Sequence, residues 1–339
     1  LIDRVKNYTN LFVLQSGPIS ENETSVNEIC DYAVKAGLSI VVYFGDLDSR
    51  VLPQEKLWRL HWLNTIKERY GDRFLGVQYY DEPGGIYIDT NWNESMIRPR
   101  NYTYANLTYD VVADVFNRRF HTDLGFEALN KNRLSVFVSD YALYWFDYLA
   151  GYDIVLAQAG WNHSLVQDIA LVRGAATMQN KSWGVIITWK YDNPPYLDSG
   201  EAIYEQMRTA YETGAEYIVI FNYPTLEGNN YGVMLDRHFE ALERFWNEVV
   251  KNLEEVHGGI KAEAALVLPR NYGWGMRHSD DRIWGWWGPD EKSPQIWAIL
   301  RQLLSRYDSR LDIVYEDSAF PIEGVYPQIY YWNQTTNFD

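Results

Sequence analysis

The chain has 339 residues, a net charge of −16 and 16% aromatic residues, among them 14 Trp and 27 Tyr. A length of this order fits one barrel of about 250 residues with an appended unit. The acidic charge excludes nucleic acid as a partner, because a phosphate backbone attracts the opposite sign. No apolar run reaches the length of about 18 residues typical of a membrane helix, so we expect no membrane span within this chain.

Seven apolar, β-branched runs predict strands, and helical patterns separate them. The predicted strands are 11–15, 38–44, 74–80, 134–139, 153–158, 183–189 and 216–221. The predicted helices are 23–36, 53–70, 110–130, 142–150, 163–177, 199–213 and 235–256. Strands separated by helices pair in parallel, since a crossover of that length cannot form a hairpin. The fold class is therefore α/β, a (β/α)8 TIM-type barrel over residues 1–257.

The eighth strand of this barrel has two candidate sources. One is a segment before Leu1, and the other is the run 263–268. We favour the segment before Leu1, because the chain opens within a helical pattern and Gly258-Gly259 is typical of a linker. The barrel is then expected to lack its first strand in this chain.

Residues 260–339 form, on this interpretation, a small α/β domain that we expect to be truncated. Its predicted elements are strand 263–268, helix 293–306 and strand 311–315, with an aromatic loop over 271–289. This order resembles the glutamine-amidotransferase-like domain that follows the barrel in some β-galactosidases. We expect the loop to pack against the barrel.

Sequons for N-glycosylation occur eight times, against roughly two expected by chance from the composition. Such a surplus indicates a glycosylated surface, so we expect covalent N-glycans and an extracellular or cell-surface location. Assembly into a homo-oligomer or a surface layer stays open. The sequon asparagines are Asn7, Asn22, Asn93, Asn101, Asn106, Asn162, Asn180 and Asn333.

The third predicted strand runs into Asp81-Glu82-Pro83-Gly84-Gly85. Active sites of barrels lie at the carboxyl ends of their strands. Side chains alternate along a strand, and this places Gly76, Gln78, Tyr80 and Glu82 in the lumen and Leu75, Val77 and Tyr79 outside. A glutamate at the barrel mouth, with Asp81 beside it, can protonate a glycosidic oxygen if burial raises its pKa.

The stretch Tyr79 to Pro83 resembles the strand-end Asp-Glu pair of barrel β-N-acetylhexosaminidases that use substrate-assisted catalysis. The resemblance implies that Glu82 is the general acid/base. It also implies that Asp81 orients the acetamido group of the substrate, which itself attacks the anomeric carbon. Five residues carry this resemblance, and the rest of the family pattern is absent from the chain.

Asp140 ends the strand 134–139 and is a third candidate catalytic carboxylate. Turned inward, it would be the nucleophile or base of a glycosidase with two carboxylates. Strict alternation places it outward, where it would cap the helix 142–150.

Other strand ends carry aromatic, amide and basic side chains that suit stacking on a sugar ring and hydrogen bonds to hydroxyl groups. The candidate sugar-binding residues are Tyr43, Tyr80, Gln158, Trp161, Trp189, Lys190 and Asn222. The six histidines are scattered along the sequence, so we expect no metal site. Phosphate-loop motifs are absent from the sequence, so we expect no cofactor.

Two functions fit these patterns. The first is a secreted glycoside hydrolase-like protein that cleaves or binds glycans at the barrel mouth. The second is a non-catalytic, glycosylated surface protein, such as an S-layer, sheath or filament subunit, on a glycosidase-like fold.

Overall fold

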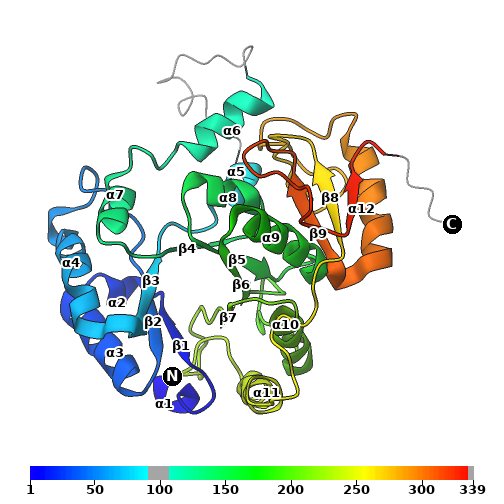
Figure 1. Cartoon of the computed structure of the whole chain (residues 1–339). Helices are drawn as coiled ribbons and strands as arrows, with labels where there is room; N and C mark the ends of the chain where they lie inside the picture. The colour runs from blue at the N-terminus through cyan, green and yellow to red at the C-terminus, as the bar shows by residue number, and fades with distance from the viewer. Residues whose placement is uncertain (91–106, 335–339) are drawn as a thin grey trace.

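The computed structural model describes residues 1–90 and 107–334, and its centre is a parallel sheet of seven strands in the order β1 to β7 (Figure 1). Each strand lies within two residues of a run predicted from the sequence, which confirms the α/β class. The strands are β1 (Leu11–Leu14), β2 (Ser39–Tyr43), β3 (Phe74–Gln78), β4 (Val136–Asp140), β5 (Ile154–Ala159), β6 (Ser182–Ile187) and β7 (Tyr217–Ile220).

Helices connect successive strands and lie outside the sheet, as Figure 1 shows. The predicted helix 110–130 is wrong in one respect, because it is broken into α6 and α7 at residues 118–123. The helices of this part are α1 (Ile2–Val5), α2 (Gly17–Ser20), α3 (Glu23–Lys35), α4 (Trp58–Tyr70), α5 (Pro83–Asp89), α6 (Tyr109–Asn117), α7 (Leu124–Lys131), α8 (Tyr144–Ala150), α9 (Leu165–Gln179), α10 (Gly200–Glu212) and α11 (Asp236–Phe245), which continues as a π-helical turn over Trp246–Val250.

The sheet is a TIM-type barrel that lacks one strand. Within the described ranges, β1 and β7 are its two edges and do not pair with each other. An apolar seam of about 120 Å³ separates them, with Phe12 and Val13 on one side and Val219 and Ile220 on the other. The run 263–268 does not fill this seam, so it is not the eighth strand of the barrel.

The lumen is filled by a small apolar cluster of Val41, Phe137, Ile154, Leu156 and Ile186. These residues come from alternate positions of their strands, because successive side chains of a strand point to opposite faces and only every second one faces the lumen. Leu75 also packs on this cluster, although alternation predicted it outside. The pairing of β2 with β3 shifts register between Ile40 and Val41, and this bulge turns Leu75 inward.

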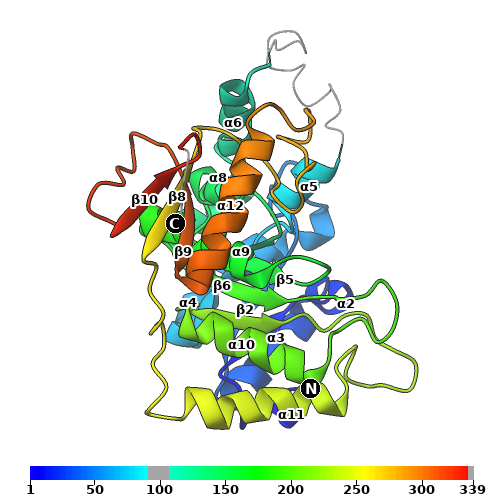
Figure 2. The same cartoon turned by 90° about the vertical axis from the view of Figure 1, so that its right-hand side faces the viewer.

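The chain after the barrel forms a second, separate parallel sheet in the order β10-β8-β9. Its strands are β8 (Ala264–Leu268), β9 (Leu311–Tyr315) and β10 (Gln328–Tyr331), and α12 (Ser293–Tyr307) covers it (Figure 2). The first two strands and the helix were predicted, whereas β10 was not. The residues of β10 are exposed or partly exposed, so its sequence shows little alternation between buried apolar and exposed polar side chains.

This second sheet packs on α9 of the barrel. Arg173 of α9 donates from Nε to Asp312 Oδ1 at 2.7 Å, and both side chains are buried. The helix and sheet approach so closely that a Cβ on Gly174 would lie 2.5 Å from the carbonyl oxygen of Ile313. Trp274 and Trp284 of the aromatic loop are also fully buried, and Trp284 contacts Phe146 of α8.

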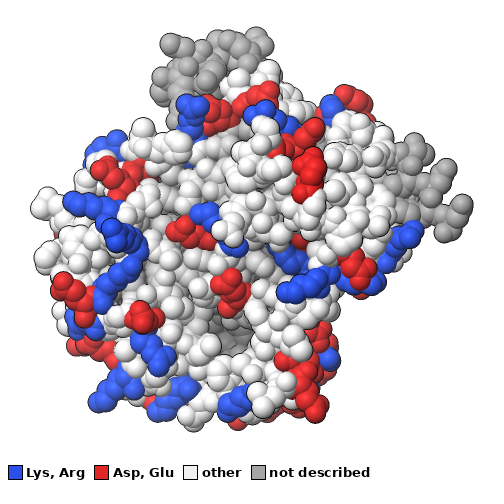
Figure 3. All heavy atoms as spheres, viewed as in Figure 1, with Lys and Arg blue, Asp and Glu red and all other residues white. Residues whose placement is uncertain are grey.

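Acidic and basic side chains are mixed over the face seen in Figure 3. Among residues 1–90 and 107–334, no helix is both long enough and apolar enough to cross a membrane.

The close approach at Gly174 yields a test of the packing. We expect Gly174→Ala to lower the free energy of unfolding by about 1–3 kcal/mol, because its Cβ forces the second sheet away from α9. Gly17→Ala is the control, since nothing lies within 4 Å of its Cβ. Urea unfolding of the two variants measures the difference, and equal stabilities would show that the contact tolerates a methyl group.

Candidate active site

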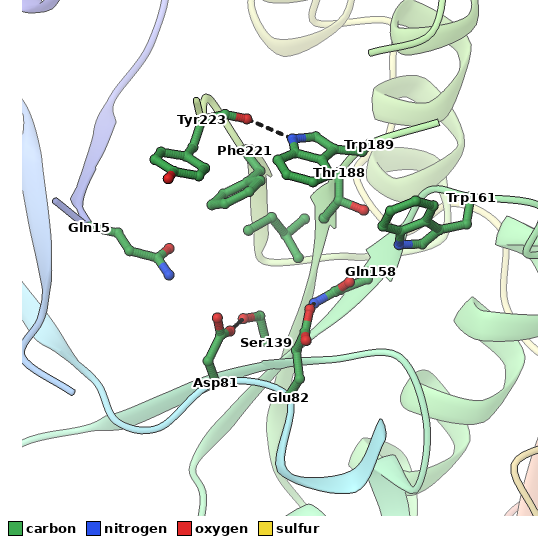
Figure 4. A pocket seen from close by; sticks show the side chains of 11 residues that line it. Gln15, Asp81, Glu82, Ser139, Gln158, Trp161, Thr188, Trp189, Phe221 and Tyr223 are labelled. Carbon is green, nitrogen blue, oxygen red and sulfur yellow. Dashed lines mark hydrogen bonds between the residues drawn. The ribbon is translucent and has the colours of Figure 1, made fainter. Parts of the chain in front are cut away.

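A cavity of about 300 Å³ opens at the carboxyl ends of the barrel strands (Figure 4). Its lining comes from the carboxyl ends of six of the seven strands and from the segments that follow them, and β2 alone contributes none of the lining residues. The lining residues are Gln15, Asp81, Glu82, Ser139, Gln158, Trp161, Ile186, Thr188, Trp189, Phe221 and Tyr223. Two of the candidate catalytic residues, Asp81 and Glu82, are among them.

The backbone leaves the strand conformation directly after β3. Tyr80 and Glu82 have left-handed φ angles of 61° and 49°. Such conformations are rare for residues other than glycine and cluster at functional sites. They break the alternation, so the adjacent Asp81 and Glu82 both face the cavity (Figure 4).

The prediction that Tyr80 faces the lumen is wrong. Its hydroxyl donates to Asp123 Oδ2 at 2.8 Å, and its ring stacks on Phe120 with centroids 5.2 Å apart. Both partners belong to the segment around the start of α7, outside the sheet. The left-handed turn at Tyr80 is the cause, because it rotates the side chain to the face that alternation assigns to Tyr79.

Asp140 holds the turn that carries the two carboxylates. Its side chain is fully buried and accepts from the backbone N–H of Gly84 at 2.5 Å and of Gly85 at 2.7 Å, in the first turn of α5. It also accepts from the N–H of Tyr141 and Ala142. A Cβ on Gly84 would lie 2.4 Å from the carbonyl oxygen of Ala142, so glycine is needed for this approach.

The structure places Asp140 outside the cavity lining, and backbone N–H groups occupy its carboxyl oxygens. It is therefore not positioned to act on a substrate in this cavity as nucleophile or base. Burial raises its pKa, and the four N–H groups act in the opposite direction. Burial and the charge of Asp140 also raise the pKa of the neighbouring Asp147 well above its ordinary value. Of these two neighbouring carboxyl groups, Asp147 therefore holds its proton more tightly than an ordinary aspartate.

Each carboxyl group in the cavity has one polar partner. Nε2 of Gln158 donates to Oε1 of Glu82 at 2.6 Å. The hydroxyl of Ser139 donates to Oδ1 of Asp81 at 2.7 Å and accepts from Gln78 at 2.9 Å. Burial, with a smaller contribution from Glu82, raises the pKa of Asp81 to about 6, although the Ser139 hydrogen bond opposes this shift.

An aromatic wall faces the carboxyl groups across the cavity (Figure 4). It consists of Trp161, Trp189, Phe221 and Tyr223. Nε1 of Trp189 donates to the carbonyl oxygen of Tyr223 at 2.6 Å, and the two rings are within 11° of parallel. A flat apolar surface opposite hydrogen-bonding groups is what a sugar ring requires, since its C–H face stacks while its hydroxyl edge is polar.

Besides Tyr80, three candidate sugar-binding residues lie outside the lining. Asn222 Oδ1 accepts from the N–H groups of Val233 and Met234 and so fixes the loop after β7. Lys190 lines a separate small cavity, to which Trp161 also contributes. Tyr43 lies near Asp81, whose charge adds to burial in raising the pKa of Tyr43, but its side chain is not part of the cavity surface.

The sequence could have identified several lining residues that were not selected as candidates. Gln15 is the polar end of a predicted strand, and the alternation applied to the third strand would also have turned Ser139 and Thr188 toward the lumen. Phe221 and Tyr223 flank Asn222, so alternation after β7 would have pointed to them. In the described part of the lining, only Asp81 and Glu82 are charged. No cluster of three or more potential metal ligands occurs in residues 1–90 and 107–334.

The raised pKa of Asp81 makes stability depend on pH. Between about pH 4 and 6 the folded protein binds the proton more tightly than the unfolded chain, so stability falls as pH rises through this window. We expect Asp81→Asn to be more stable than the parent at pH 7, by about 2–3 kcal/mol at most, with the gain vanishing below pH 4. Thermal unfolding at both pH values checks this, and a gain that persists at pH 4 would refute a protonation effect.

Comparisons by sequence find no matching protein family and no matching curated protein. Among solved structures, an exo-β-1,4-mannosidase from Opitutaceae bacterium strain TAV5 matches with a TM-score of 0.53 and 11% identity over 97% of this chain and 67% of its own. A xylanase from Cellvibrio japonicus has a TM-score of 0.40 and 10% identity over 72% of this chain and 91% of its own. A broad-specificity endoglucanase from Clostridium longisporum has a TM-score of 0.40 and 14% identity over 73% of this chain and 85% of its own.

These structural neighbours are glycoside hydrolases. At such low identity the mannosidase match establishes the fold, a glycosidase-like barrel in which this chain has seven strands. The roles of the individual site residues rest on the geometry described above.

Proposed function

We propose that the chain is a glycoside hydrolase-like protein that binds a glycan in the cavity at the barrel mouth and cleaves a glycosidic bond there. One observation carries the proposal: two adjacent carboxyl groups face an aromatic wall inside one cavity at the carboxyl ends of the strands. This position is where barrel enzymes place their chemistry.

The proposed mechanism is substrate-assisted. A glycosidase with two catalytic carboxylates places them on opposite sides of the scissile bond, about 5–9 Å apart. The described lining has both of its carboxyl groups on neighbouring residues and none on the aromatic wall. An acetamido group of the substrate would supply the missing nucleophile.

Glu82 is the proposed general acid/base, which protonates the leaving oxygen and then deprotonates water. Asp81, with a pKa of about 6, is mostly ionised at neutral pH and would accept the acetamido N–H. This hydrogen bond polarises the acetamido oxygen for attack on the anomeric carbon. Loss of the Asp81 charge below pH 6 should therefore reduce turnover.

The charged groups that line the cavity limit which sugars it can bind. The described lining has two carboxyl groups and no Lys, Arg or His. An acidic sugar would place a further negative charge beside the ionised Asp81, which is unfavourable at short range. The proposed substrate is accordingly a glycan with a neutral N-acetylhexosamine residue.

The second candidate is a non-catalytic, glycosylated surface protein, such as an S-layer, sheath or filament subunit. The absence of an opposing carboxylate from the described lining favours it, because a decayed active site would show this feature. Such a protein would retain the glycosidase-like fold and bind sugar without turnover.

We also propose an extracellular or cell-surface location with N-glycans. The side chains of Asn7, Asn22, Asn162, Asn180 and Asn333 are all exposed, as glycan attachment requires. Asn93, Asn101 and Asn106 lie outside the described residues.

Replacement of Glu82 tests the catalytic role. Glu82→Gln keeps the shape of the side chain but cannot donate a proton, so turnover of a native glycan with a poor leaving group should fall by about 10²–10⁴-fold. An activated aryl glycoside needs less protonation and should be affected less. Asp81→Asn should affect N-acetylhexosaminides more strongly than hexosides.

The control is Glu254→Gln, an exposed carboxylate after α11 that changes the net charge equally. Sugar binding by the parent without turnover of aryl glycosides or native glycans would favour the non-catalytic alternative. Absence of both binding and turnover would refute the carbohydrate assignment.

The native protein tests the glycosylation proposal. We expect its intact mass to exceed 39.7 kDa by several glycans, and peptide mapping to place them on most of the sequon asparagines. Enzymatic or chemical deglycosylation should return the mass of the polypeptide. An unmodified mass from the native source would remove both the glycan and the location proposals.

A further inference from the structure

The helix α5 directly follows the carboxyl pair, and its two ends are held by different parts of the molecule. Its first turn donates two backbone N–H groups to Asp140 of the barrel. Its last residue, Asp89, accepts from Arg277 Nη2 at 2.8 Å and from the hydroxyl of Tyr141 at 2.7 Å. Arg277 belongs to the aromatic loop that follows β8.

Arg277 is itself fixed within that loop. Its Nε and Nη2 donate to the two oxygens of Asp281, each at 2.8 Å. Asp281 is buried and also accepts from the backbone N–H of Arg277 and Arg282. A guanidinium group that is already paired in a planar fork loses little freedom when it binds a further carboxylate.

The middle of α5 contacts the same loop. The ring of Tyr87 packs edge-to-face on Trp284, with centroids 5.9 Å apart. The approach is so close that a Cβ on Gly285 would lie 2.1 Å from the carbonyl oxygen of Tyr87. The loop therefore touches both the side chains and the backbone of this helix.

We propose that the aromatic loop of the C-terminal unit positions Asp81 and Glu82 through α5, with Arg277 as the positioning residue that anchors its far end. The loop contributes no residue to the described cavity lining, so it acts through the helix and not through the sugar. An effect of the loop on turnover rests on the proposed function, whereas an effect of the loop on the environment of the Asp81 carboxyl group does not.

The test uses Asp89→Asn in the full chain, because this change weakens the tie to α5 and leaves Arg277 paired with Asp281. A loosened α5 admits water to Asp81 and should lower the midpoint of its titration by about half a pH unit or more, measured by ¹³C NMR of labelled aspartate. Turnover of p-nitrophenyl N-acetyl-β-D-glucosaminide should fall several-fold, mainly in kcat. Asp89→Glu retains the ion pair and should restore both values.

Tyr109→Phe is the matched control, since it removes a hydrogen bond to Asp290 between α6 and the same C-terminal unit but leaves α5 untouched. It should shift Tm to a similar extent without moving the Asp81 midpoint. The proposal is overturned if Asp89→Asn leaves that midpoint unchanged, or if Tyr109→Phe moves it equally. A parent without turnover contradicts the proposed function alone, because the NMR comparison still decides the role of the loop.

Discussion

The carboxylate of Asp140 bound to the N–H groups of Gly84 and Gly85 is the interaction on which the site depends. A buried carboxyl group of this kind is tolerated only when donors surround it, and four backbone N–H groups do so here. The N–H groups of Gly84 and Gly85 tie the turn after β3 to the end of β4, and this tie holds the left-handed backbone at Glu82 that lets Asp81 and Glu82 face one cavity.

Much of the barrel was predictable because its strands are buried on both faces and appear as continuous β-branched runs, such as 38–44. Placement of Glu82 at the strand end followed from the same pattern. The orientation of Tyr80 did not, since nothing in the sequence marks a left-handed tyrosine. The role of Asp140 was also hidden, because its donors in α5 are 55 and 56 residues away along the chain.

The barrel and the C-terminal unit contribute to the site in different ways. The barrel supplies the carboxyl pair and the aromatic wall, while the second sheet is bound to α9 by the buried pair of Arg173 and Asp312. Its aromatic loop then covers α5. Two of the 14 Trp residues, Trp161 and Trp189, line the cavity, whereas Trp274 and Trp284 of the aromatic loop are core.

A crystal structure of the protein soaked with N,N′-diacetylchitobiose would show whether the carboxyl pair engages an acetamido sugar. We predict one sugar ring against Trp161 or Trp189, its acetamido group at Asp81, and the glycosidic oxygen within about 3.2 Å of Glu82. An empty cavity at saturating sugar, or a disaccharide bound elsewhere on the chain, would contradict it.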